Sequence, residues 1–189
     1  MNIYDPYPDT VTVGCKPYAL DLAFDNVLRC IDIENDPALT MQDRRFVQCA
    51  LLLENEIDIP KTLNEQCELV KAVFDLFPKP EETGGERFLD FHQDAALIRS
   101  AFFRIGVDLT RDRIHFCQFY ELLADLPRDT ALMRTIEIRQ KPIPKPTKDN
   151  AEQIAALQKA KARVAIRMSE EERRSLFAES LKNSTLLKG

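Results

Sequence analysis

Residues 88–145 decide the fold, and they read FLDFHQDAALIRSAFFRIGVDLTRDRIHFCQFYELLADLPRDTALMRTIEIRQKPIPK. In the first part of this stretch, apolar residues recur at steps of three and four, which places them on one face of a helix. They are Phe88, Phe91, Ala95, Ile98, Phe102 and Ile105. Gly106 interrupts the pattern, and glycine readily adopts the left-handed conformation that closes a helix. We therefore predict a helix that begins near Phe88 and ends at Gly106.

A second helix is predicted between Gly106 and Pro127. Asp108 or Thr110 can cap its N-terminus, and Pro127 ends it because proline lacks the backbone donor and clashes with the preceding turn. The apolar arc of this helix is wide, and it comprises Ile114, Phe116, Phe119, Tyr120, Leu122, Leu123 and Leu126. So wide an arc indicates a position at the centre of the core.

The first third of the chain predicts a β-hairpin followed by three helices. Apolar and polar residues alternate from Val11 to Leu20, on both sides of a turn that contains Gly14. Thr40 is the predicted cap of the second helix, and Thr62 with Glu65 forms a capping-box pattern before the third. The apolar stripes of the three helices are Phe24, Val27, Leu28 and Ile31; Phe46, Cys49 and Leu53; and Leu63, Cys67, Val70, Phe74 and Phe77.

Composition and charge predict one helical domain with an extension. The chain has 189 residues, of which 44% are hydrophobic and only 5 are glycine, a composition that favours helices. Residues 1–141 contain 16 Lys or Arg and 25 Asp or Glu, a net charge of −9, whereas residues 142–189 contain 10 and 6, a net charge of +4. We predict a mainly α protein: a compact helical domain with a small N-terminal β-hairpin over residues 1–141, and a proline-led, basic, helical extension over residues 142–189.

The predicted extension follows a third helix of the quoted stretch, which we expect from about Asp129 through Ile136. The prolines of KPIPKP beyond Arg139 then favour an extended connector. The extension has two short apolar stripes, which comprise Ile154, Leu157, Val164 and Met168, and then Leu176, Phe177 and Leu181. These residues are too few to form a separate core. The extension either docks on a partner or a second copy, or stays solvated and partly helical.

No set of side chains in the sequence points to catalysis or to a metal. Cys117 lies two residues from His115, so the two side chains diverge on a helix and a nucleophile–base pair is disfavoured. His92 and His115 are expected to join neighbouring helices through hydrogen bonds rather than to bind a metal. The cysteines lack the paired short spacing of a zinc site, and we expect them to be buried, reduced and structural. They are Cys15, Cys30, Cys49, Cys67 and Cys117. We predict no enzymatic activity and no cofactor.

The sequence contains no run of about 18 apolar residues and no basic-then-apolar leader. We therefore expect no membrane span and no secretory signal, and we place the protein in a cytosol. Gly84-Gly85 is the only glycine pair, and without repeated glycines and a following lysine it predicts a surface loop rather than a phosphate-binding loop.

The order and spacing of several residues carry a resemblance to a known family. They are His92-Gln93-Asp94, Ile98, Phe102, Phe103, Gly106 through Thr110, His115-Phe116, Phe119, Leu122-Leu123, Leu126-Pro127 and Ile138-Arg139, followed by the proline-rich stretch. This pattern resembles the bacteriophage gene product fifteen family, and the likeness extends over about residues 10–165. Members of the family usually carry tryptophan after the histidine, where this chain has Phe116 and Cys117, so packing there is expected to differ.

The resemblance implies a protein of tail morphogenesis, because the family is encoded beside the tape measure gene. It implies a tail assembly chaperone that binds the tape measure protein or other tail proteins in the host cell cytoplasm, and it implies no reaction. One alternative is a structural component retained in the virion tail. A nucleic-acid-binding regulator is less favoured, because the overall balance is acidic and no aromatic platform is evident.

The predicted contacts lie in the helices from Phe88 to Leu126 and in the extension, through which the protein could also self-associate. The predicted contact residues are Phe91, Phe102, Phe103, Phe116, Tyr120, Leu157, Val164, Leu176 and Phe177.

Overall fold

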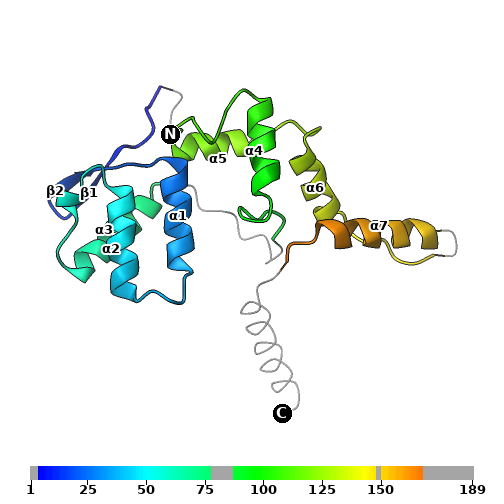
Figure 1. Ribbon diagram of the computed structural model, residues 1–189, viewed down its shortest axis with the longest axis horizontal. Helices are drawn as coiled ribbons and strands as arrows, with labels where there is room; N and C mark the ends of the chain where they lie inside the picture. Colours follow the sequence, from blue (N-terminus) through cyan, green and yellow to red (C-terminus); the bar gives the residue numbers. More distant parts are fainter. Residues whose placement is uncertain (1–3, 78–86, 148–149, 168–189) are drawn as a thin grey trace, which may run out of the picture. The chain divides into compact units, whose positions relative to one another are not determined.

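The structure is a computed structural model that describes residues 4–77, 87–147 and 150–167 (Figure 1). Over these residues the chain forms seven α-helices, one short 3-10 helix and one two-stranded hairpin. The elements are β1 (Thr10–Val13), β2 (Lys16–Ala19), α1 (Phe24–Glu34), α2 (Met41–Leu52), η1 (Glu56–Asp58), α3 (Leu63–Phe74), α4 (Ala95–Arg104), α5 (Phe116–Ala124), α6 (Ala131–Gln140) and α7 (Ala151–Val164). The prediction of a mainly α fold with a small N-terminal hairpin is confirmed.

The chain divides into two compact units. Among the described residues, the first comprises 4–77 and 102–126, and the second comprises 87–101, 127–147 and 150–167. α4 therefore contributes its beginning to the second unit and its end to the first. This grouping differs from the sequence-based boundary at residue 141, which stays a prediction about where an independently folding domain ends.

The hairpin turns at Gly14, as predicted. β1 and β2 are antiparallel, and Val13 pairs with Lys16, which leaves a two-residue loop. Gly14 has φ +61°, the positive value that the first central position of a type II′ hairpin turn requires. The strand after the turn brings Tyr18 and then Leu20 into the core, where they are 7% and 4% exposed.

Predicted caps begin two helices of the first unit. The Thr40 hydroxyl accepts a hydrogen bond from the backbone N–H of Asp43 (3.2 Å) at the start of α2. Thr62 and Glu65 form the complete reciprocal capping box at the start of α3. Such a cap stabilises its helix by about 1 kcal/mol, because it satisfies backbone donors that the helix leaves unpaired.

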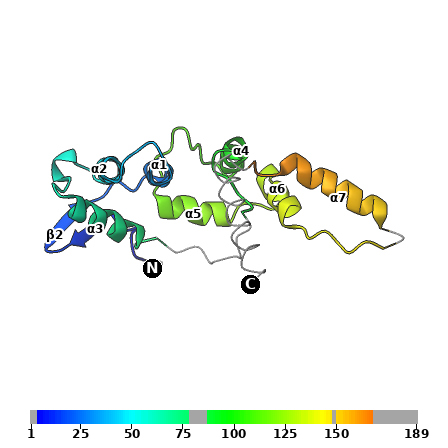
Figure 2. The ribbon, with the colours of Figure 1, turned by 90° about the horizontal axis from the view of Figure 1, so that it is seen from below.

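The segment between β2 and α1 joins two distant parts of the first unit. The backbone N–H of Asp21 donates to the carbonyl of Leu52 (2.8 Å), and that of Phe116 donates to the carbonyl of Leu22 (2.8 Å). This segment therefore holds the end of α2 on one side and the start of α5 on the other. Figure 2 shows α1 and α2 end-on and side by side, with α3 running across them.

The core of the first unit combines aliphatic residues with stacked aromatic rings. The ring of Phe119 stacks on Phe24 and on Phe102, with centroid distances of 4.9 and 5.0 Å. The main cluster of buried residues is Tyr18, Leu20, Leu22, Val27, Cys30, Cys49, Leu52, Leu53, Leu69, Val70, Val73, Phe77 and Cys117. The predicted central position of the second helix is confirmed for Phe119, which is 1% exposed.

α4 begins seven residues later than predicted and ends as predicted. The Asp90 carboxylate accepts hydrogen bonds from the backbone N–H groups of His92 (2.9 Å) and Gln93 (2.7 Å), which forms a separate turn before the helix. Phe88 and Phe91 therefore precede α4, and the prediction that they belong to its stripe is wrong. At the other end Gly106 has φ +86°, and the N–H of Val107 donates to the carbonyl of Phe102 (3.0 Å), which completes a Schellman closure.

α5 also begins later than the sequence suggested. The predicted cap Asp108 is used locally, since its carboxylate accepts from the backbone N–H and the hydroxyl of Thr110 (3.0 and 2.7 Å). His115 caps α5 instead: its Nδ1 accepts a hydrogen bond from the backbone N–H of Cys117 (3.1 Å). Ile114 consequently lies before the helix.

In the second unit, α7 packs against α6. α6 begins at the cap Thr130, whose hydroxyl accepts from the backbone N–H of Met133 (3.2 Å). Residues 142–147 have no regular secondary structure, which agrees with the predicted extended connector. The apolar stripe of α7 is half-buried rather than free.

Candidate interaction surfaces

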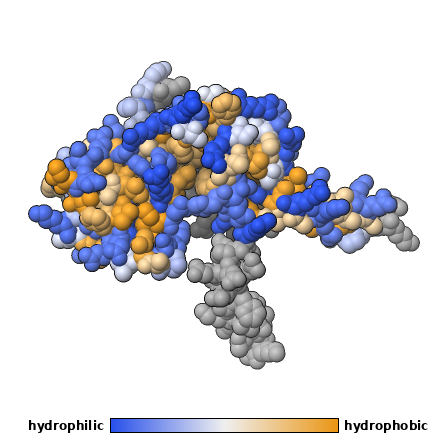
Figure 3. Space-filling model, in the orientation of Figure 1, coloured by the Kyte–Doolittle hydropathy of each residue, from blue (hydrophilic) through white to orange (hydrophobic). Residues whose placement is uncertain are grey.

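A groove with an apolar lining lies on the first unit, between α1, α2 and α3. Its volume is about 410 Å³, and it is lined by Ile31, Glu34, Asn35, Met41, Arg45, Gln48, Cys67, Val70, Lys71 and Phe74. We call it the α1–α3 groove. Two of its apolar lining side chains are exposed, Ile31 by 37% and Met41 by 55%. Apolar surface is visible over the helices of this part of the chain, at the left of Figure 3.

Three polar side chains of the groove satisfy one another. Gln48 is 1% exposed, and its amide donates to the carbonyl of Cys30 (2.9 Å) and to the carboxylate of Glu34 (3.1 Å). The guanidinium of Arg45 donates to the side-chain oxygen of Gln48 (2.7 Å) and forms an ion pair with Glu34. The hydrogen bond from Arg45 lowers the pKa of Glu34, so the pair stays charged at neutral pH. These groups need no polar ligand, and a partner would gain mainly from apolar contact.

Lys71 is the remaining cation of the groove. Within the described part of the chain its ammonium group forms no hydrogen bond or ion pair, in contrast to the guanidinium of Arg45. Its ammonium group is therefore a local positive charge beside an otherwise neutral apolar floor.

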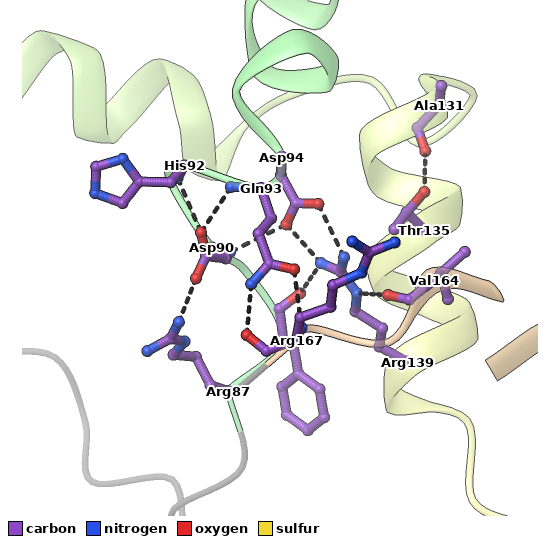
Figure 4. Close-up of polar contacts among 11 residues, drawn as sticks. Arg87, Asp90, His92, Gln93, Asp94, Ala131, Thr135, Arg139, Val164 and Arg167 are labelled. Atoms are coloured by element: carbon purple, nitrogen blue, oxygen red, sulfur yellow. Dashed lines mark hydrogen bonds and ion pairs between the residues drawn. The ribbon is translucent and has the colours of Figure 1, made fainter. Parts of the chain in front are cut away.

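A buried ion pair organises the second unit (Figure 4). Arg139 of α6 binds Asp94 through two hydrogen bonds of 2.5 and 2.8 Å, and the two side chains are only 9% and 3% exposed. The same guanidinium donates to the carbonyls of Phe88 (2.9 Å) and Val164 (2.6 Å). Asp94 also accepts from the backbone N–H of Asp90 (3.0 Å). One side chain thus joins the turn before α4, the helix α6 and the end of α7.

Two more side chains hold α7 and the residues that follow it. The side-chain amide of Gln93 both donates to the carbonyl of Arg167 and accepts from its N–H, each at 2.8 Å. The ammonium of Lys161 donates to the carbonyl of Arg139 (2.7 Å). Because the polar groups of this cluster are engaged with one another, its geometry is that of a structural joint rather than of a site waiting for a ligand.

The structure distributes the predicted contact residues over very different environments. Phe103, Tyr120 and Phe91 are exposed by 70%, 40% and 37%. Phe116 is half-buried in the aromatic cluster, and Leu157 and Val164 are half-buried on α7. Leu176 and Phe177 lie outside the described residues.

Phe102 requires a correction. Its side chain is 0% exposed and stacks on Phe119, so it belongs to the core and offers no contact surface. The apolar stripe with Ile98 already indicated a buried position, whereas Phe103, one residue further, points away from that stripe.

The groove residues were not among the predicted contacts. Helical spacing places Ile31 and Phe46 on core stripes, yet they are 37% and 52% exposed, and Met41 belongs to none of the predicted stripes. Apolar spacing does not reveal this, because Phe46, Cys49 and Leu53 also recur at helical steps; the structure buries Gln48, Cys49 and Leu52 instead.

The cysteines are mostly buried, as predicted. Cys30 and Cys49 are 0% exposed, and burial raises the pKa of their thiols to about 12 and about 11, so both are neutral. Burial also raises the pKa of Cys117. Cys15 is exposed and Cys67 is partly exposed, against the expectation that all five are buried.

His115 forms hydrogen bonds at the margin of the core, but they reach its own helix and the N-terminal segment rather than the neighbouring helix predicted from the sequence. Its Nδ1 meets the backbone N–H of Cys117 and not the thiol, and its Nε2 lies 3.1 Å from the carbonyl of Pro8. The ring also stacks on Tyr7, with centroids 4.9 Å apart. Tyr7 donates in turn to the carboxylate of Glu121 (2.7 Å), and this hydrogen bond raises its pKa to about 12. The contact joins the N-terminal segment to α5.

Residues 4–77, 87–147 and 150–167 contain no group of three or more His, Cys, Asp or Glu side chains arranged to hold a metal ion. None of the helices in these ranges combines the length and the apolar character needed to cross a membrane.

Comparison with known proteins identifies the family. The family model of the bacteriophage Gp15 protein matches residues 3–166, and the chain belongs to this family. The match spans the hairpin, both compact units and α7, so it extends the likeness seen in the sequence. No curated protein and no solved structure matches the chain. Membership supports a phage-related structural or morphogenesis role.

Proposed function

We propose that the protein is a phage tail assembly chaperone, which binds apolar helical segments of the tape measure protein during tail morphogenesis. Membership in the bacteriophage Gp15 family supports the phage context. The observation that carries the binding role is the α1–α3 groove, where Ile31 and Met41 are exposed beside three mutually satisfied polar side chains. The proposed role is non-covalent and needs no cofactor.

Apolar stripes of an unassembled helical protein expose surface that promotes aggregation. A chaperone that covers such a stripe removes its apolar surface from water, at roughly 25 cal/mol per Å² of apolar area. The bound state must still be reversible, because the tail protein later encloses the tape measure. A groove of about 410 Å³, open to solvent and limited to one part of the chain, suits moderate affinity. We place this binding in the host cell cytoplasm.

Co-expression with fragments of the tape measure protein from the same phage tests the proposal. The expected result is stable co-purification of one or more helical fragments, with a lower aggregated fraction of the tape measure protein. The control is the same fragment expressed alone. If no fragment co-purifies at low or at physiological salt, and aggregation is unchanged, the chaperone role is contradicted.

The protein content of purified virions of the same phage distinguishes this role from that of a permanent tail component. A chaperone is absent from purified virions, whereas a structural component is present there in stoichiometric amount. Virion proteomics reads this out directly, and stoichiometric protein in the particle would replace the chaperone proposal with the structural one.

A further inference from the structure

We propose that the outer edge of β1 is a docking site for one extended segment of a protein partner, which adds to the hairpin as a third strand. The residues of β1, Thr10–Val13, do not line the α1–α3 groove. The bound segment is a strand and not a helix, so this site does not depend on the proposed function.

The outer edge of β1 carries unpaired backbone groups at alternate residues. In an antiparallel pair every second residue bonds to the neighbouring strand, and the residues between direct their N–H and C=O groups outward. The N–H of Leu20 donates to the carbonyl of Asp9 (2.8 Å), which sets this alternation, so the outward residues are Thr10 and Thr12. Both are exposed, and within the described part of the chain their backbone groups have no hydrogen-bond partner.

The other edge of the hairpin is closed. On β2 the outward residues are Pro17 and Ala19. Proline has no N–H, and the carbonyl of Ala19 accepts from the backbone N–H of Glu54 (3.2 Å). β1 has no such protection, since it contains no proline and no charged residue and its pairing with β2 has no bulge. An incoming strand can therefore pair with the hairpin only at β1.

β1 is held in its extended conformation before any partner binds. Val11 and Val13 pack against the main cluster of buried residues, and α3 packs against β1. The edge needs no ordering on binding, so only the incoming segment loses conformational entropy. Addition of a strand to such an edge is a common mode of peptide recognition, in which backbone hydrogen bonds hold the segment.

The edge specifies the chemistry of the segment. Thr10 and Thr12 each offer one N–H and one C=O, so the two residues of an antiparallel segment that face them must not be proline. The segment residue between these two lies opposite Val11, on the face that packs against the core, where a β-branched apolar side chain fits best. The partner therefore supplies a short apolar-centred strand.

Pairing of the edge with β1 of a second copy is disfavoured. Antiparallel pairing of two β1 strands would place α3 of both copies on the same face, against strands about 4.8 Å apart, whereas packed helices need about 8–10 Å. Contact through the four residues of β1 would also bury far less than the roughly 800 Å² per partner of a stable interface.

The described basic extension of a second copy does not fit the edge either. Its backbone over α7 is already bonded within a helix. Among residues 142–147 alternate positions are proline, and the Asn150 side chain accepts from the N–H of Thr147 (2.7 Å) and donates to the carbonyl of Lys145 (3.0 Å). Only Ile143 of this stretch keeps both backbone groups unpaired, whereas the edge needs two such residues.

Hydrogen exchange of the full chain, followed by NMR, tests the site. The probe is a peptide of about nine residues whose centre alternates threonine and valine, the pattern of an edge-pairing strand. In the free protein we expect the amides of Thr10 and Thr12 to exchange rapidly and those of Val11 and Val13 to be protected. The probe should slow Thr10 and Thr12 at least about fivefold. The control is the same peptide with N-methylated central amides, which lacks the donors and should have no effect.

A matched pair of variants locates the binding. Thr12→Pro removes one outward N–H without removing a bond to β2, as Pro17 does on the opposite strand. Thr12→Ala keeps that N–H and changes only the side chain. By fluorescence anisotropy we expect Thr12→Pro to weaken the probe about tenfold and Thr12→Ala by less than about threefold. Protection of the Val11 amide shows that the hairpin is intact; if Thr12→Pro does not fold, the two peptides on the unaltered protein decide.

The proposal is overturned if the probe does not slow exchange at Thr10 and Thr12, if the N-methylated peptide binds equally well, or if both variants lose the same affinity. Protection of these two amides without peptide would also overturn it. Protection that rises with protein concentration, together with a dimer in sedimentation, would assign the edge to a second copy; protection independent of concentration would assign it to the chain itself. None of these measurements involves the tape measure protein, so each outcome leaves the proposed function standing.

Discussion

Asp94 and Arg139 lie 45 residues apart in sequence and form a two-point ion pair that is almost completely buried. Burying charge is costly, so such a pair is stable only when its remaining hydrogen-bonding groups are also satisfied. Arg139 meets this condition by binding the carbonyls of Phe88 and Val164. The pair thereby holds both the segment before α4 and the end of α7 against α6, the helix that carries Arg139.

Removing one member of this pair should be strongly destabilising. Arg139→Met leaves the Asp94 carboxylate buried without its partner, and we expect the free energy of unfolding to fall by about 3–5 kcal/mol. Urea denaturation measures this loss. The control is Arg134→Met, the same change at an exposed position of α6, which should alter stability by less than about 0.5 kcal/mol.

The double variant Asp94→Leu with Arg139→Met tests whether the loss comes from an unpaired charge. Because no buried charge then remains, we expect the double variant to be more stable than Arg139→Met alone, as replacement of buried ion pairs by apolar residues often shows. Additive losses in the two single variants would contradict this explanation.

The cap of α5 should make stability depend on pH. Burial lowers the pKa of His115 below its ordinary value of 6.5, while its hydrogen bond to Pro8 and the carboxylates of Asp9 and Glu121 act in the opposite direction. The neutral ring accepts a hydrogen bond at Nδ1, which a protonated ring cannot do. This contribution to stability is present above the ordinary pKa of 6.5 and is lost as the pH falls through the lowered folded-state pKa.

The free energy of unfolding at about pH 7.5 and about pH 5.5 measures this dependence. His115→Asn keeps a side-chain oxygen that can cap α5 but does not titrate. We expect the stability of this variant to fall less between the two pH values than that of the unaltered protein. An equal fall in both proteins would assign the pH dependence to other groups.

Truncation of two adjacent phenylalanines of α4 should lower the stability by very different amounts. Phe102 is 0% and Phe103 is 70% exposed. We expect Phe102→Ala to lower the free energy of unfolding by about 3–5 kcal/mol, because it opens a cavity beside Phe119. Phe103→Ala should cost less than about 0.5 kcal/mol. Thermal or urea denaturation compares the two, and similar losses would contradict the buried placement of Phe102.

Gln93 should control local opening after α7. The Arg167 amide donates to the Gln93 side chain, a single neutral hydrogen bond worth about 1 kcal/mol. In Gln93→Ala we expect hydrogen exchange at the Arg167 amide to become about fivefold faster, with little change in global stability. Gln153→Ala, at an exposed position of α7, serves as the control and should leave that amide unchanged.

Local sequence was enough to predict the hairpin turn at Gly14, the caps Thr40 and Thr62, and the closure at Gly106. In each case the donor, the acceptor or the backbone preference lies within a few residues, so the interaction can be read before the chain folds. The same holds for the mainly helical class, since the apolar spacing needs only the geometry of one helix. The family could also be inferred from the order of residues between His92 and Arg139.

Apolar spacing alone did not reveal the turn at Asp90 that delays the start of α4, although its hydrogen bonds to His92 and Gln93 are local. Contacts between distant residues determined the rest: Asp94 pairs with Arg139, and His115 lies against Pro8. Periodicity shows that Ile31 and Phe102 lie on apolar faces, but not how far neighbouring helices cover each face. That coverage depends on packing, which buries Phe102 against Phe119 and leaves Ile31 and Met41 exposed in the groove. The candidate binding surface is therefore a property of three helices together and of none of them alone.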